Sequence, residues 1–180
     1  MTATDLEQLR YPVGRMPRHP EPLNARERGE HLAIIEALPA RIRSLVAELT
    51  DAQLETPYRA GGWTIRQVVH HVADSHMTAY VRIKLAATED HPTVKTYHEE
   101  LWAELPEAKS APVETSLALI EALHHRLMAF LRALPPETWR RAFRHPEWGT
   151  VSIDECVTLY SWHCRHHTAH IEQALNSKSN

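Results

Sequence analysis

Apolar residues recur every three, four or seven positions in four long segments of the chain, which is the period of an amphipathic helix. Asn24, Thr64 and Ser152 each precede a glutamate or glutamine by three residues, the spacing of a capping box at a helix start. Pro112 suits the first turn of the remaining segment. The pattern predicts four long helices, at about 24–49, 64–87, 112–134 and 152–175. Pro39 is expected to kink or break the first, because proline removes a backbone donor.

The segments between these helices predict only short elements. Residues 1–23 contain four prolines and show little periodicity, so we expect an extended arm laid over the body. The predicted organisation is an N-terminal arm over residues 1–23 and an all-α four-helix bundle over residues 24–180. The expected short elements are a capped turn at 50–53, a short helix near 97–104, a turn at 135–139 and a hairpin within 141–151.

Composition fits a single domain and excludes several classes of protein. The chain has 180 residues, of which 43% are hydrophobic and 24% charged, and it contains only five glycines. The net charge is −3 and the sequence contains no block of basic residues, so it does not predict a surface that binds nucleic acid. No stretch is apolar enough to span a bilayer, and no signal-peptide core follows Met1. We therefore expect a cytoplasmic protein without nucleic-acid or membrane partners.

The two cysteines are predicted to be free thiols. Cys156 and Cys164 lie eight residues apart on the last predicted helix, about 12 Å along its axis, which exceeds disulfide reach. Free thiols are typical of a reducing cytoplasm. Cys164 falls on the apolar stripe and is interpreted as a core filler, although nearby histidines keep a nucleophilic role open.

Four histidines fall within eight residues of the last predicted helix. At about 100° per residue, His163 and His167 lie nearest its apolar stripe, whereas His166 and His170 are expected to be more exposed. Being four apart, His163 and His167 share one helix face and can bind one metal ion. The metalloprotease pattern would need a glutamate between them, which is absent. The alternative is a set of polar surface histidines.

A third ligand is sought among the histidines of the second helix. His76 lies closest to the apolar stripe of that helix, and His71 lies to one side, so periodicity slightly favours His76. His76 could equally be a core histidine with satisfied hydrogen bonds. His124 and His125, in the third helix, are interpreted as structural or solvated. The roles of His70, His76, His166 and His170 stay open.

Two runs of sequence resemble the YfiT group of the DinB-like superfamily. They are residues 57–76 and 159–171, and the early Tyr11-Pro-Val-Gly14 and the His145-Pro146 step extend the likeness from Tyr11 to Ile171. The resemblance implies a four-helix bundle, often dimeric, with metal-dependent hydrolase activity. It places a divalent metal, zinc or nickel and one per chain, on His71, His163 and His167. Where the superfamily often has Gly-Gln after the last ligand, this chain has Thr168-Ala169-His170.

Three neutral imidazoles leave a divalent ion its full charge and an open coordination position, as in catalytic sites. Such an ion would activate water to hydrolyse a small-molecule substrate. No general base is evident beside the ligands; Asp74 and Glu172 lie within about a turn of them and are candidates for orienting them. The alternatives are a bacillithiol-type thiol S-transferase and a non-catalytic metal-binding stress protein. The sequence assigns neither the substrate nor a catalytic residue.

Overall fold

The computed structural model describes residues 3–177, and four long helices dominate it. These are α2, α4, α7 and α8, each of twenty or more residues. The elements in chain order are α1 Ala3–Arg10, α2 Ala25–Val46, α3 Asp51–Leu54, α4 Ile65–Thr88, α5 Glu99–Trp102, α6 Pro106–Ser110, α7 Val113–Arg132, the 3₁₀ helix η1 Pro136–Arg140, β1 Ala142–His145, β2 Gly149–Ser152 and α8 Ile153–Asn176.

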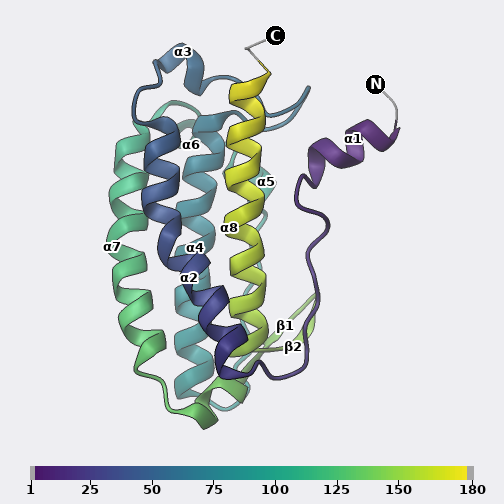
Figure 1. The fold of residues 1–180 in the computed structure, drawn as a ribbon, viewed down its shortest axis with the longest axis vertical. Coiled ribbons are helices and arrows are strands. Elements are labelled where there is room, and N and C mark those ends of the chain that lie inside the picture. The colour runs from purple at the N-terminus through teal and green to yellow at the C-terminus, as the bar shows by residue number, and fades with distance from the viewer. Residues whose placement is uncertain (1–2, 178–180) are drawn as a thin grey trace.

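The four long helices form the predicted all-α four-helix bundle (Figure 1). Helices α2 and α4 each pack against both α7 and α8, so α2 lies diagonally opposite α4, and α7 lies opposite α8. Helices α2 and α8 run in one direction, while α4 and α7 run in the other. Because α4 and α8 are antiparallel neighbours, the start of α4 faces the end of α8. Among residues 3–177, no helix is both long and apolar enough to cross a bilayer.

The capping signals begin the helices as predicted, with one difference. Reciprocal capping boxes form at Asn24 and at Thr64. At α8, the side chain of Ser152 accepts the Glu155 N–H, but the carboxylate of Glu155 binds Arg18 instead of completing the box. The second half of the predicted box at Ser152 is therefore wrong, because an arginine of the N-terminal arm competes for the glutamate.

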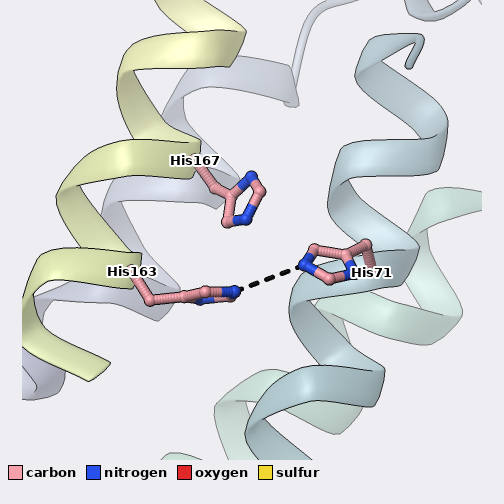
Figure 2. A group of neighbouring side chains, drawn as sticks. All are labelled: His71, His163 and His167. Carbon is pink, nitrogen blue, oxygen red and sulfur yellow. Dashed lines mark hydrogen bonds between the residues drawn. The ribbon is translucent and has the colours of Figure 1, made fainter. Parts of the chain in front are cut away.

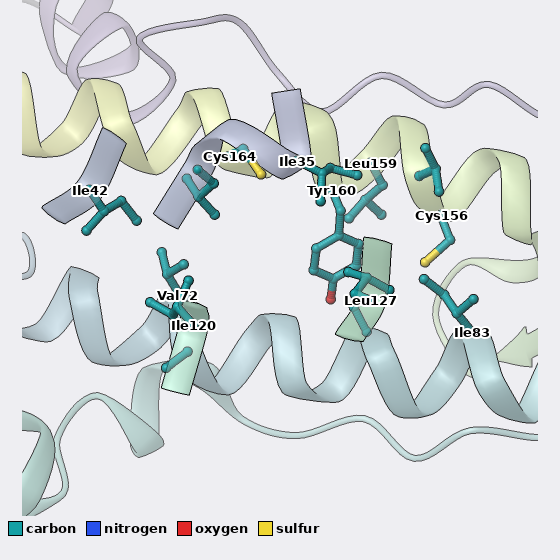
Figure 3. Close-up of a cluster of buried hydrophobic side chains, with 14 of the residues drawn as sticks. Ile35, Ile42, Val72, Ile83, Ile120, Leu127, Cys156, Leu159, Tyr160 and Cys164 are labelled. Carbon is teal, nitrogen blue, oxygen red and sulfur yellow. The ribbon is translucent and has the colours of Figure 1, made fainter. Parts of the chain in front are cut away.

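The apolar stripes of the four helices meet in one core (Figure 3). Each long helix contributes large side chains with almost no exposed surface, since burying them is the main stabilising term of the fold. Labelled members include Ile35 and Ile42 of α2, Val72 and Ile83 of α4, Ile120 and Leu127 of α7, and Leu159 and Tyr160 of α8. Cys156 and Cys164 are free and buried in this core. Burial raises the pKa of Cys156 to about 12 and raises that of Cys164 further, which disfavours a nucleophilic role for either thiol.

Helix α2 continues through Pro39, so the break considered at that residue does not occur. Proline lacks the N–H that would bond the carbonyl of Ile35 four residues earlier. That carbonyl accepts a hydrogen bond from Nδ1 of His124 in α7, over 2.8 Å. A side chain of a neighbouring helix therefore replaces the missing donor.

The sequence predicted an extended N-terminal arm. The structure differs in part, because residues 3–10 form the helix α1. The rest of the arm is irregular and lies over the body, as expected, where it contacts α8. Nε1 of Trp162 donates to the carbonyl of Gly14, and the N–H of Leu23 donates to the carboxylate of Asp154. The arm thus covers one face of α8.

The connections agree with the prediction except between α4 and α7. The hairpin forms with Phe143 opposite Val151, and Gly149 supplies the positive φ of 74° that its turn requires. The predicted short helix near 97–104 forms as α5, and a second short helix, α6, follows it. The second begins at Pro106, where the fixed φ of proline favours the first helical position.

Asp154→Ala is expected to lower the free energy of unfolding by about 3 kcal/mol, since the partly buried Arg28 guanidinium would lose both oxygens of its buried carboxylate partner. Arg28 donates to the two oxygens of Asp154 over 2.8 and 3.0 Å. Urea unfolding followed by circular dichroism measures the loss. The matched control is Glu30→Ala, which removes an exposed ion pair with Arg26 and should change stability by less than about 0.5 kcal/mol. Equal losses in the two variants would contradict this view.

Candidate metal centre

The antiparallel packing of α4 and α8 brings His71, His163 and His167 together (Figure 2). The three rings point into the space between the two helices, and one nitrogen from each lies within 4.8 Å of the others. The Nε2 atoms of His71 and His163 are 3.3 Å apart. All three side chains are buried. The structure therefore groups the three residues to which the family resemblance assigned the metal.

Burial keeps these three rings uncharged at neutral pH. It lowers the pKa of His71 to about 4, and it holds the pKa values of His163 and His167 well below the usual value of 6.5. The neighbouring histidines reinforce the effect, because a second positive charge in the group would be repelled. Neutral imidazoles offer the lone pairs that a metal requires.

The geometry fits a divalent transition metal. Two imidazole nitrogens bound to one tetrahedral zinc ion, at about 2.0–2.1 Å each, lie about 3.3 Å apart. The Nε2 atoms of His71 and His163 have that separation. Three neutral nitrogen donors suit zinc, nickel or copper better than magnesium or calcium, which prefer oxygen.

A second group of histidines adjoins the first along α8. One ring nitrogen of each of His166, His167 and His170 lies within 4.8 Å of the others, and all three residues are buried. The expectation that His166 and His170 are more exposed is wrong, because the N-terminal arm and the α3–α4 loop cover them. Tyr11 stacks on His166, and Tyr58 stacks on His170 with ring centres 3.9 Å apart.

The other histidines have different surroundings. His76, which periodicity slightly favoured as a ligand, is fully buried, and its Nε2 lies 3.2 Å from Nδ1 of His163. It thus contacts the ring atom of His163 that faces away from His71. His70 bonds to Ser116 and to the carbonyl of Ala111. His124 is buried between α2 and α4, whereas its neighbour His125 is exposed.

A cavity of about 500 Å³ opens onto the three histidines. Its wall combines aromatic, basic and acidic side chains from the arm, the loop before α4 and the hairpin. The residues that line it include Trp63, Arg59, His166 and His170. Sequence reasoning gave no role to Trp63, whose ring lies 4.6 Å from that of His71; no periodicity marks a loop residue as part of a site.

The two carboxylates proposed near the ligands are not among the residues that line this cavity. Glu172 pairs with Arg41 and is partly exposed. Burial and the nearby Glu107 carboxylate raise the pKa of Asp74 to about 6. The Nδ1 atom of His166, in contrast, is buried at the cavity wall and has no hydrogen-bond partner within residues 3–177.

Comparison with known proteins identifies relatives along nearly the whole chain. A sequence profile of the DinB superfamily matches residues 34–171. A Bacillus cereus protein that is provisionally named a metal-dependent hydrolase is 47% identical over 166 residues, covering 92% of this chain and 95% of that protein. A similarly named protein of Bacillus thuringiensis subsp. konkukian has the same identity and coverage.

Solved structures agree with the fold. YfiT from Bacillus subtilis superposes with a TM-score of 0.92 at 40% identity, covering 96% of this chain and 98% of that one. It is provisionally identified as a metal-dependent hydrolase with an unusual four-helix bundle topology. Another four-helix bundle protein, at 22% identity and a TM-score of 0.52, shows likeness of fold alone.

Proposed function

The chain belongs to the DinB superfamily, and from this membership and the histidine site we propose that it is a metal-dependent hydrolase of a small-molecule substrate. One observation carries the proposal: three neutral histidines converge beside a cavity of about 500 Å³. That volume is within the usual range for sites that bind small molecules. The provisional names of the relatives support the same class of reaction.

We propose zinc or nickel, one ion per chain, on His71, His163 and His167. When bound, such an ion acts as a Lewis acid that activates water and polarises the bond to be cleaved. With three protein ligands, such an ion would keep a further coordination position for water or substrate, as catalytic sites do. Trp63 lies against His71 and limits the access of bulk water to that side of the site.

Two groups in the cavity are suited to handling the substrate. His166 has an unpartnered Nδ1, and burial lowers the pKa of its ring to about 3, so at neutral pH the ring is uncharged and Nδ1 can accept a hydrogen bond. Arg59 lines the same cavity and supplies a positive charge for an anionic part of the substrate. His166 belongs to α8 and Arg59 to the loop before α4, and both line the cavity.

Hydrolysis that requires the metal is the expected result of stripping the protein with a chelator and reloading it with zinc or nickel. A panel of small esters, amides and phosphoesters would be assayed with stripped, reloaded and His167→Ala protein, each with and without added thiol. Reloaded wild type should cleave at least one class, and both other preparations should fall to background. His166→Gln should retain the metal while kcat falls by about tenfold, because the imidazole acceptor for a substrate hydrogen bond is lost.

Three outcomes separate the alternatives. Turnover only with added thiol would identify a thiol S-transferase and contradict hydrolysis. Tight metal binding with no turnover across the panel would favour a non-catalytic metal-binding protein. Turnover that survives chelation would contradict a role for the metal.

We also propose that the protein is a cytoplasmic homodimer, as its family resemblance implies. Sedimentation equilibrium of the full chain would give about twice the 20.6 kDa chain mass if it is correct. A mass of one chain at micromolar concentration would contradict it.

A further inference from the structure

A row of three histidines crosses the bundle from α2 to the candidate metal centre. The carbonyl of Ile35 in α2 contacts Nδ1 of His124 in α7 at 2.8 Å. Nε2 of His124 lies 2.9 Å from Nδ1 of His76 in α4, and Nε2 of His76 lies 3.2 Å from Nδ1 of His163 in α8. All four helices of the bundle thus contribute one member.

The carbonyl fixes the direction of every hydrogen bond in this row. A carbonyl oxygen only accepts, so Nδ1 of His124 must carry the proton. Burial keeps the rings neutral, which leaves Nε2 of His124 as an acceptor for the Nδ1–H of His76. His76 then accepts at Nε2 from the Nδ1–H of His163. The Nε2 of His163 is left with a lone pair, and it is this atom that faces His71.

Pro39 explains why the row begins at Ile35. In an uninterrupted helix the carbonyl of Ile35 would accept the N–H of residue 39, and proline has none. The carbonyl is therefore free to bond His124, whose side chain is almost fully buried. Because Pro39 has no N–H, the carbonyl of Ile35 is available as the acceptor that sets the direction of the hydrogen bonds in the row.

We propose that His124 and His76 are positioning residues that fix the tautomer and the ring orientation of His163 toward the metal. This inference rests on the proposed metal site but not on hydrolysis. A ligand histidine whose remote N–H has an acceptor is oriented before the ion arrives, and such partners contribute strongly to metal affinity. In the metal-free protein the 3.3 Å contact is a hydrogen bond from Nε2 of His71 into the lone pair of His163.

His167 has a shorter arrangement of the same kind. Nε2 of His170 donates to the carbonyl of Arg10 in the arm, over 3.3 Å, so its Nδ1 is an acceptor. Nδ1 of His167 lies 3.4 Å from that atom and donates to it, which leaves Nε2 of His167 for the metal. His170 therefore orients a ligand instead of completing a second metal site with His166 and His167.

Nitrogen-15 spectra of metal-free wild type with labelled histidine test the row directly, because two-bond couplings tell protonated from unprotonated ring nitrogens. His124, His76 and His163 should each carry the proton on Nδ1. A proton on Nε2 of His163 would overturn the proposal. This result depends on neither a variant nor any enzymatic activity, so failure of the hydrolase proposal leaves it intact.

Variants at His124 test the consequence for metal affinity. His124→Phe keeps the ring but removes both nitrogens, and the affinity for zinc, measured by competition with a chelating indicator, should fall by about tenfold to a hundredfold. His124→Gln keeps an N–H donor and a carbonyl acceptor, so its affinity should stay within about threefold of wild type. The matched control, His125→Phe, changes the exposed neighbour on α7 and should leave affinity unchanged.

Thermal unfolding of each metal-free variant separates positioning from a merely structural role. A His124→Phe protein that is less stable but binds zinc as wild type does would overturn the proposal. Equal loss of affinity in the Phe and Gln variants would overturn it as well, since packing and not hydrogen bonding would then be responsible. If the Phe variant does not fold, the Gln variant and the wild-type spectra still decide.

Discussion

His163→Ala and His167→Ala are expected to reduce bound zinc or nickel from about one ion per chain to background. Removing one of three nitrogen donors should cost more than about a hundredfold in affinity, above the loss typical for a residue that only supports a ligand. His71→Ala should behave in the same way, although it lies on a different helix. The three residues form one buried group, so each is needed to complete it.

Elemental mass spectrometry of purified protein gives the metal content, and a chelator competition gives the affinity. His98→Ala is the matched control, because that histidine is exposed and lies outside both histidine groups. His166→Gln distinguishes the two histidine groups, which share His167. If the ion binds to His71, His163 and His167, this variant should retain the metal. Loss of metal in His166→Gln with retention in His71→Ala would show that the ion sits on the second group instead.

The fold was largely predictable because the signals that encode it are local. Capping side chains, the proline at the start of α7 and the apolar stripes determined where the long helices begin and end to within a few residues. The same count of about 100° per residue turned His163 and His167 inward, where the structure has them. These predictions needed nothing beyond the helix that carries the residue.

What could not be predicted depends on contacts between distant segments. Helix α4 is buried on nearly all sides, so periodicity could not separate His71 from His76, and family resemblance had to choose. His166 and His170 are covered by Tyr11 and Tyr58, which belong to segments without periodicity. The partnership of Pro39 with His124 was likewise invisible, since it joins a missing donor in α2 to a ring in α7.

The metal-free protein is expected to lose stability as the pH falls from 7.5 to 5.5. Burial lowers the pKa values of His71, His124 and His170 to about 4 and that of His166 to about 3, and it holds the pKa values of a remaining group of three well below the usual 6.5. The remaining group consists of His76, His163 and His167.

The direction of this pH dependence follows from the number of protons that the folded and unfolded chains bind. Between the folded and unfolded pKa values the unfolded chain binds more protons, so stability is present above about pH 6.5 and is lost as pH falls. Between those two pKa values, each such histidine lowers the free energy of unfolding by about 1 kcal/mol for every unit by which the pH falls. Asp74 and Glu99 act in the opposite direction, because burial raises the folded pKa of both carboxyls, that of Asp74 to about 6, but the buried histidines outnumber them.

Summed over the buried histidines, the expected loss is several kilocalories per mole. An ordinary domain has a free energy of unfolding of about 5–15 kcal/mol, so this loss is a large part of it. Urea unfolding in the presence of a chelator at pH 7.5 and 5.5 measures the loss, and His124→Gln, which removes one buried imidazole, should show a smaller pH dependence than wild type. Equal stability at the two pH values would contradict neutral buried rings.

Added zinc should raise stability at pH 7.5 far more than at 5.5, because protons compete with the ion for the same nitrogen lone pairs.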